Sequence, residues 1–98
     1  MKIYIAGPMK GKKDKNIPEF LAAQEMLESL AFIVLNPAIL PEREEITKEQ
    51  YMDIDLAMIR ACDHIYMLKG WQDSSGAFLE HAYAKYLGLE IVYQEEPK

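Results

Sequence analysis

Short runs of β-forming residues alternate with longer stretches of helical periodicity, and this alternation constrains the fold more than any other feature of the chain. The apolar runs are 2–6, 32–35, 63–68 and 90–93. Between them, apolar residues recur at helical spacing over 17–30, 47–61 and 75–87. Strands and helices that alternate through short connections predict a parallel sheet with helices on both faces. We therefore expect one α/β domain over residues 1–98, ending in a polar tail at 94–98.

The connections also indicate the strand order and the place of a ligand site. Right-handed crossovers make 2-1-3-4 the most natural order for four parallel strands. The first and third strands then flank the switch point of the sheet, outside whose carboxyl ends ligands bind. The loops after them, 7–13 and 70–75, are expected to meet over one crevice. The charged segment 38–48 reads as a loop that folds over it.

Composition narrows the class of protein. Half of the 98 residues are hydrophobic, which is enough for one core, and the net charge of -5 argues against binding to a nucleic acid polymer. Cys62 is the only cysteine, so there is no intrachain disulfide. No signal peptide and no apolar run of membrane-spanning length is evident, which predicts a cytoplasmic protein without a membrane partner. His64 and His81 lie far apart in the sequence and no CxxC or HExxH motif occurs, so we expect no metal and no organic cofactor.

Glu80 is the first candidate for chemistry. Small residues over 74–77 suit a turn and a helix start, and Gly88 suits the end of that helix. A helix N-terminus attracts anions, so we expect this position to favour the ionised form of Glu80. A partly enclosed carboxylate there can act as a nucleophile at a sugar carbon. The alternative is a solvated glutamate on a helix surface, as expected for Glu90.

Asp55 is the second candidate. It lies two positions from Asp53, so the two carboxylates cannot share one face of their helix. One is expected to face solvent, while the other can point towards the crevice. If Asp55 approaches Glu80, the two carboxyls titrate as a coupled pair, and one can stay protonated as a general acid.

Two segments can bind a phosphate or a sugar. The loop after the first strand holds two glycines and three lysines, and the alternative is an ordinary solvated loop; its residues are Gly7, Pro8, Met9, Lys10, Gly11, Lys12 and Lys13. Ser74 and Ser75 can cap the third helix, with Ser75 reaching the N–H of residue 77 or 78. Either hydroxyl can instead donate to a phosphate or sugar oxygen, and Gly76 permits close backbone approach.

Aromatic residues are candidates for stacking on a base. Tyr4 lies within the first strand, where an aromatic residue is more often part of the core. Trp71, in the loop after the third strand, is the better candidate. His81 points about 100° away from Glu80 around the helix and is expected at the surface or at a subunit contact.

Taken together, these residues resemble the nucleoside 2-deoxyribosyltransferase-like superfamily over about residues 3–93. The resemblance rests on Tyr4-Ile5-Ala6-Gly7-Pro8-Met9-Lys10-Gly11, Asp55-Leu56, Ala61-Cys62-Asp63 and Ser74-x-Gly76-x-x-x-Glu80-x-x-x-Ala84. The chain is most similar to small phage and bacterial domains of unassigned function, and also to deoxynucleoside 5′-monophosphate N-glycosidases. The resemblance implies a flavodoxin-like or Rossmann-like three-layer sandwich.

The resemblance also implies residue roles. Glu80 matches a glutamate that attacks C1′ of a 2-deoxyribosyl group, and Asp55 matches an aspartate that binds the sugar and helps protonate the leaving base. Ser74 falls where the nucleotide hydrolases place a phosphate-binding serine, which favours a 5′-monophosphate. The loop that cradles the nucleotide is matched by Gly7, Met9, Lys10 and Gly11. Pro8 departs from the serine of the hydrolases and removes a hydroxyl and an N–H.

The expected function is cleavage or exchange of an N-glycosidic bond through a glycosyl intermediate on Glu80. The substrate is a small nucleoside or a (deoxy)nucleoside 5′-monophosphate; water as acceptor gives hydrolysis and a second base gives transfer. The alternative is a non-catalytic module that holds a nucleotide or signalling nucleotide, and a weaker one is a scaffold protein. A homo-oligomer is expected, because a small domain exposes much surface and the second and third helices are rich in Met, Tyr and Leu.

Overall fold

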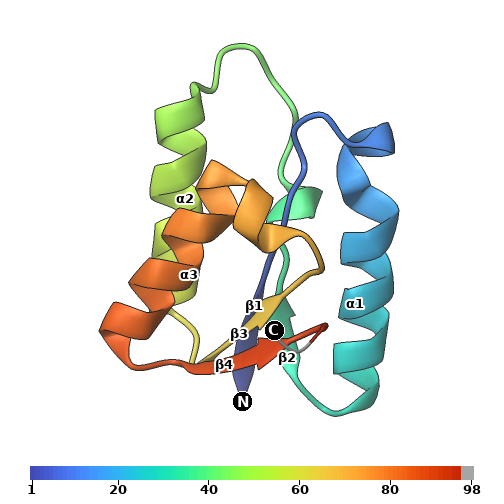
Figure 1. The fold of residues 1–98 in the computed structure, drawn as a ribbon, viewed down its shortest axis with the longest axis vertical. Helices are drawn as coiled ribbons and strands as arrows, with labels where there is room; N and C mark the ends of the chain where they lie inside the picture. The colour runs from blue at the N-terminus through green and yellow to red at the C-terminus, as the bar shows by residue number, and fades with distance from the viewer. Residues whose placement is uncertain (96–98) are drawn as a thin grey trace.

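Four parallel strands form the sheet of this chain in the order β2-β1-β3-β4, as the sequence predicts (Figure 1). The computed structural model describes residues 1–95, so 96–98 of the expected polar tail lie outside the described residues. The strands are β1 (Lys2–Ala6), β2 (Ile33–Leu35), β3 (His64–Met67) and β4 (Glu90–Tyr93). The flavodoxin-like α/β fold is thereby confirmed.

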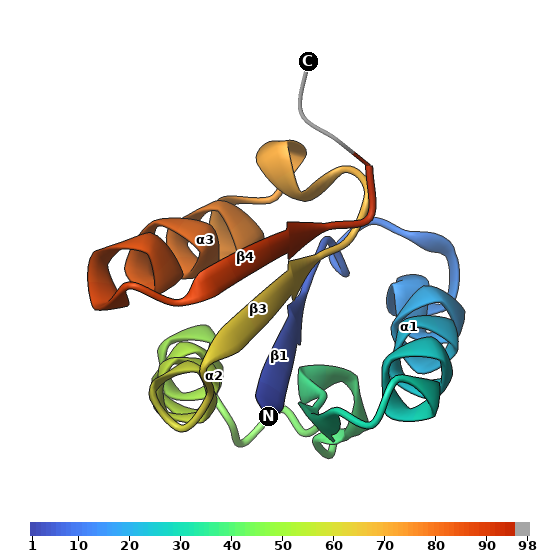
Figure 2. The same ribbon diagram turned by 90° about the horizontal axis from the view of Figure 1, so that it is seen from below.

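Helices cover both faces of the sheet. They are α1 (Ile17–Ser29), α2 (Lys48–Arg60) and α3 (Ser75–Leu87). Figure 2 shows α1 on one face and α2 with α3 on the other, which makes three layers. The loops also hold single turns of 3₁₀ helix that the sequence did not predict, namely η1 (Lys13–Asn16), η2 (Pro37–Ile39) and η3 (Trp71–Asp73).

Local sequence explains where two of the helices begin or end. Thr47 Oγ1 accepts from the Gln50 amide at 3.1 Å, and Gln50 Oε1 accepts from the Thr47 amide at 2.8 Å. This is a reciprocal capping box, which satisfies two backbone amides at the start of α2. Helix α3 ends at Gly88, whose φ of 81° is the left-handed conformation that glycine adopts most easily.

Strand alternation divides the core into two clusters. On the α2–α3 side, Tyr4 packs with Ile65 and Met67; on the α1 side, Ile3 and Ile5 pack with other apolar residues. Successive side chains of a strand point to opposite faces, so one apolar run supplies both clusters. Strand β1 is therefore buried on both faces, as expected of an interior parallel strand.

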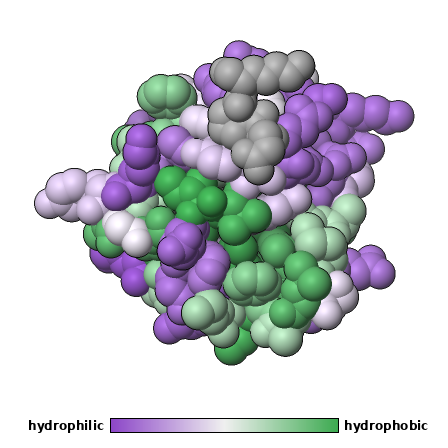
Figure 3. Space-filling view, turned by 60° about the horizontal axis from the view of Figure 1, so that its bottom comes forward, coloured by the Kyte–Doolittle hydropathy of each residue, from purple (hydrophilic) through white to green (hydrophobic). Residues whose placement is uncertain are grey.

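The surface keeps a number of large apolar side chains. Figure 3 shows hydrophobic surface gathered across the middle and lower part of the face it draws, bordered by hydrophilic side chains. On α2 and α3, the exposed apolar residues are Ile54, Phe78, Leu79, Tyr86 and Leu87. Among residues 1–95, the helices are too short and too polar for one of them to span a bilayer.

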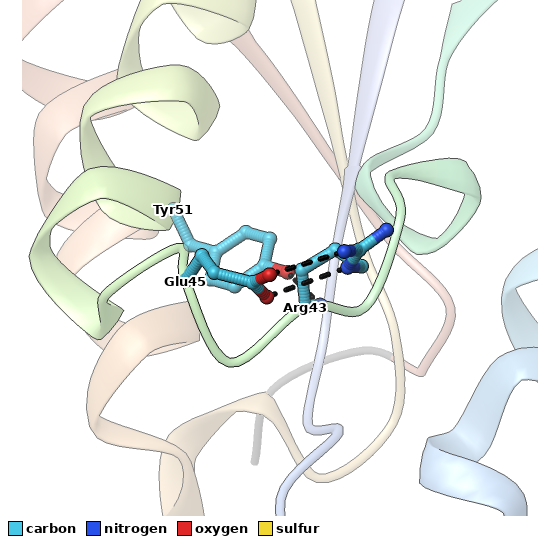
Figure 4. Close-up of polar contacts among 3 residues, drawn as sticks. All are labelled: Arg43, Glu45 and Tyr51. Atoms are coloured by element: carbon cyan, nitrogen blue, oxygen red, sulfur yellow. Dashed lines mark hydrogen bonds and ion pairs between the residues drawn. The ribbon is translucent and has the colours of Figure 1, made fainter.

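Hydrogen bonds hold the segment before α2 against that helix. Figure 4 shows the Tyr51 side chain pointing towards Arg43, with Glu45 beside it. The Tyr51 hydroxyl donates to the Pro41 carbonyl at 2.5 Å and accepts from the Arg43 amide at 3.0 Å. Arg43 in turn binds Glu45, with 3.1 Å between Nη2 and Oε2. The loop between β2 and α2 is thus held by a side chain of α2 itself.

The ends of β1 and β3 approach each other closely at Gly7. A Cβ added to Gly7 would lie 2.7 Å from Cβ of Leu68, which is closer than van der Waals contact allows. The Leu68 amide donates to the Ala6 carbonyl at 2.8 Å. Glycine is needed here for space, and the two loops meet as the strand order predicts.

We predict that Gly7→Ala lowers the free energy of unfolding by about 1–3 kcal/mol, because the new methyl group forces the two strand ends apart. Urea denaturation measures the change. Gly76→Ala is the matched control, since its Cβ would meet only Cε of Met52 at 3.5 Å and alanine is the better helix former. Equal stability of the two variants would contradict this explanation.

Candidate active site

A cavity of about 670 Å³ opens between the loops that follow β1 and β3 and the first turns of α2 and α3. Of the residues expected at the site, those that line it are Tyr4, Gly7, Pro8, Met9, Lys10, Asp55, Ser74, Ser75, Gly76 and Glu80. Its volume is in the range of small-molecule sites. The structure thus brings together most of the candidate residues from three separate segments of the chain.

Glu80 lies at the wall of this cavity, only 5% exposed, in the second turn of α3. The hydroxyl of Tyr4 donates to its Oε2 at 2.8 Å. Tyr4 is itself fully buried, and strand alternation turns its ring towards α3. The sequence suggested base stacking or a core position for Tyr4 and missed this hydrogen bond. The available signal was the need of a buried tyrosine hydroxyl for a polar partner.

Asp55 faces Glu80 from α2, while Asp53 is exposed, as the helical spacing predicted. The two carboxyls are close enough to hydrogen-bond to each other. Asp55 Oδ1 is buried and has no donor among residues 1–95 when both carboxyls are ionised. A proton on Glu80 supplies that donor, so the pair is satisfied when it holds one proton.

The pKa shifts of the two carboxyls agree with one proton shared by the pair. Burial, followed by the charge of Asp55, raises the pKa of Glu80 well above its ordinary value, although the Tyr4 hydrogen bond opposes the shift. Burial raises the pKa of Asp55 to about 6, against the hydrogen bonds of Glu80 and Tyr4. The sequence had favoured an ionised Glu80 because of the helix N-terminus. The raised pKa opposes that expectation, because desolvation and a second carboxyl outweigh the helix dipole.

The start of α3 supplies hydroxyl groups to the cavity. Ser74 caps the helix, its Oγ accepting from the Ala77 amide at 3.2 Å. The sequence offered both Ser74 and Ser75 for this role and expected Ser75 to reach the amide; Ser75 is instead the exposed first helical residue. Because Ser74 acts as an acceptor in the cap, its hydroxyl proton stays available to a ligand.

Trp71 lies away from the cavity, although the sequence predicted it beside the site. It is buried under α3 and stacks on His81, with 4.1 Å between ring centroids. His81 also meets the Tyr93 hydroxyl at 2.8 Å through Nε2, so it belongs to a packed cluster and is half-buried rather than exposed. Single-turn helix η3, which the sequence did not reveal, turns the indole inward.

Two further expectations change with the structure. Gly11, predicted in the cradle, is exposed and does not line the cavity. Residues 38–47, predicted to fold over the site, do not line it either, whereas the flanking Pro37 and Lys48 do. The contacts of this loop go to Tyr51 and, through an ion pair from Glu42, to Lys15.

Several lining residues were not singled out from the sequence. Lys48 and Met52 come from the first turns of α2 and share a face with Asp55. Their spacing of four and three residues was the signal that could have found them. The cavity is further lined by Phe20, Pro37, Glu49, Gly70, Asp73, Ala77 and Leu79, and by Lys12, which the sequence placed in the candidate phosphate loop. Among residues 1–95, no group of three or more histidine, cysteine, aspartate or glutamate side chains is placed to hold a metal ion.

We predict that Glu80→Gln stabilises the protein above neutral pH. The raised pKa of Glu80 means that its contribution to stability is complete below the unfolded pKa, near 4.3, and is lost as the pH rises through the folded pKa. Glutamine cannot ionise and can still accept from Tyr4. We expect its advantage to grow between pH 5 and pH 8 to more than about 1 kcal/mol.

Urea denaturation of both proteins across this pH range measures the difference. Glu90→Gln, at an exposed position of β4, is the matched control and should give a difference that does not grow with pH. A constant difference for Glu80→Gln as well would contradict the assignment of a raised pKa.

Comparison with known proteins completes the description of the site. The fold is similar to that of a 2-desoxiribosyltransferase from Leishmania mexicana, with a TM-score of 0.74 and 23% identity over 94% of this chain and 62% of that one. It is also similar to a 2-deoxyribosyltransferase from Bacillus psychrosaccharolyticus, with a TM-score of 0.75 and 23% identity over 100% of this chain and 77% of that one. No curated protein matches the sequence. The family described as "Domain of unknown function (DUF4406)" matches residues 1–93, so the chain belongs to that family and has a nucleoside 2-deoxyribosyltransferase-like fold.

Proposed function

We propose that this protein cleaves or exchanges the N-glycosidic bond of a nucleoside or of a (deoxy)nucleoside 5′-monophosphate, with Glu80 as the nucleophile. The observation that carries the proposal is the buried Glu80 at the cavity wall, in contact with both Tyr4 and Asp55. Two carboxyls that share one proton are a means of supplying a nucleophile and an acid together. The 2-deoxyribosyltransferases of similar fold support the same class of reaction.

In the first step, a Glu80 oxygen bonds to C1′ while the bond from C1′ to the base nitrogen breaks. The base leaves with the proton of the Asp55 carboxyl. The raised pKa of Glu80 favours that proton on Glu80, so this step requires its transfer across the hydrogen bond to Asp55. The Tyr4 hydroxyl, which donates to Oε2, then stabilises the Glu80 carboxylate.

In the second step, an acceptor replaces Glu80 at C1′. A water oxygen bonds to C1′, the ester bond to Glu80 breaks, and Asp55 takes the proton of the water; a second base in place of water gives transfer. The contact between the Glu80 and Asp55 carboxyls favours this covalent route over direct attack by water. Inverting enzymes, which use direct attack, place their carboxyls roughly 6.5–9.5 Å apart to hold a water between them.

A 5′-phosphate fits the start of α3. Ser74, Ser75 and Gly76 line the cavity at the N-terminus of a 13-residue helix. Free amide groups and the helix dipole attract an anion at this place, and the Ser74 hydroxyl adds a donor. These features favour a nucleotide over a nucleoside.

The test is release of free base, followed by chromatography. The purified protein is incubated with deoxynucleosides and their 5′-monophosphates, with and without a second base. Glu80→Gln and Asp55→Asn are expected to lower turnover about 100-fold or more. Glu90→Gln and Asp53→Asn, at exposed positions, are the matched controls and should stay within about twofold.

The outcomes separate the candidate functions. Base release without an acceptor indicates a hydrolase, and release only with a second base indicates a transferase. Since the pair must hold one proton, turnover should fall on both sides of an optimum, with the acidic limb near the Asp55 pKa of about 6. Full turnover by Glu80→Gln contradicts the mechanism. Nucleotide binding without turnover in the wild type favours the non-catalytic binding module.

We further propose that the chain forms a homo-oligomer through α2 and α3, because their outer faces carry exposed apolar side chains. Tyr86, which is 85% exposed, is the most prominent. Sedimentation should show a dimer or larger species that Tyr86→Lys weakens at least tenfold. Leu21→Lys, on α1, is the matched control. A monomeric wild type, or an equal effect of both variants, would contradict this assignment.

A further inference from the structure

Three lysines from two distant segments lie around the mouth of the same cavity. Lys10 and Lys12 belong to the loop after β1, and Lys48 is the first residue of α2. In Figure 1 this loop and the start of α2 lie at the same end of the molecule. All three side chains are exposed and line the cavity. We call them the rim lysines.

The rim lysines have no acidic partner within residues 1–95. Elsewhere Lys15 pairs with Glu42, and Lys69 pairs with Glu95. The carboxylates of Glu49 and Asp73 also line the cavity, yet neither forms an ion pair with a rim lysine. In a chain of net charge -5, three lysines without an ion pair gather around one opening and outnumber the two exposed carboxylates, Glu49 and Asp73, that line it.

A single phosphate does not match this charge. A phosphate monoester carries about two negative charges at neutral pH. The start of α3, with Ser74 and Ser75, already offers donors to one phosphate. The rim lysines then add three positive charges at the opening, where an extended anionic chain can reach them. A ligand with several phosphates places an anion both at the start of α3 and at the rim lysines, whereas a monophosphate leaves one of these two places without an anion.

We propose that the rim lysines bind the outer phosphates of a polyphosphate chain, so that the ligand of this cavity is a nucleoside di- or triphosphate. The assignment of a nucleoside to one end of this ligand rests on the proposed function. The polyphosphate end rests on Lys10, Lys12 and Lys48. Each part therefore has its own test.

The test is calorimetric titration of Glu80→Gln, which is expected to leave the ligand intact. The probes are deoxynucleoside 5′-mono-, di- and triphosphates of the four bases, and inorganic tripolyphosphate, all with a chelator to remove divalent cations. We expect the dissociation constant to fall at least tenfold from monophosphate to triphosphate. We expect tripolyphosphate alone to bind, and its affinity to weaken steeply as salt is added.

The matched variants locate the effect. Lys12→Ala and Lys48→Ala, introduced together into Glu80→Gln, should abolish the tenfold gain in affinity from monophosphate to triphosphate and the binding of tripolyphosphate. The affinity for the monophosphate should change less than threefold. Lys2→Ala with Lys85→Ala removes the same charge at exposed positions that do not line the cavity, and should leave the gain intact.

The outcomes separate this inference from the proposed function. Equal affinity for mono- and triphosphates, or a gain that survives loss of Lys12 and Lys48, would overturn the role of the rim lysines even if the wild type releases base. Conversely, tripolyphosphate binding that depends on these lysines supports their role even if no base is released from any substrate.

Discussion

The pairing of β1 with β3 is the constraint on which the rest of this structure depends. It aligns Tyr4 with Ile65, buries β1 on both faces, and brings the loops after the two strands into contact at Gly7 and Leu68. The cavity forms where these loops meet the first turns of α2 and α3. Because parallel strands end at the same edge of a sheet, residues far apart in sequence gather there.

The same arrangement buries two carboxyl groups at the cavity wall, which disfavours the charged form of each. Glu80 and Asp55 are carried by helices that pack against one face of the sheet, so both carboxyls lose solvent and meet each other. A buried pair of carboxyls is stable only when it holds a proton, and the hydroxyl of Tyr4 is the nearest donor that favours ionisation of Glu80. Sites prepared for chemistry commonly retain such unfavourable charge at the expense of stability.

Charge is separated along the cavity. The carboxyl pair lies at the buried wall, whereas Lys10, Lys12 and Lys48 stand at the opening in contact with solvent. This separation follows from desolvation, since an ammonium group stays charged cheaply at the surface while a carboxyl in the interior takes up a proton. A ligand that is neutral at one end and anionic at the other matches this division.

The sequence by itself determined the sheet order and the helix boundaries to within about two residues, because these follow from periodicity, capping and crossover handedness, which are local or general rules. It offered Glu80 and Asp55 as candidates, from their places in the chain and from a family resemblance, and left open whether the two carboxyls meet. Only the tertiary structure decided that the pKa of Glu80 is raised, that Tyr4 is its hydrogen-bond partner, and that Trp71 belongs to the core. These properties depend on burial and on contacts between positions 4, 55 and 80, which belong to three different elements. A local pattern contains no information about which of its polar groups will lose water, and desolvation is the largest cause of the shifts at this site.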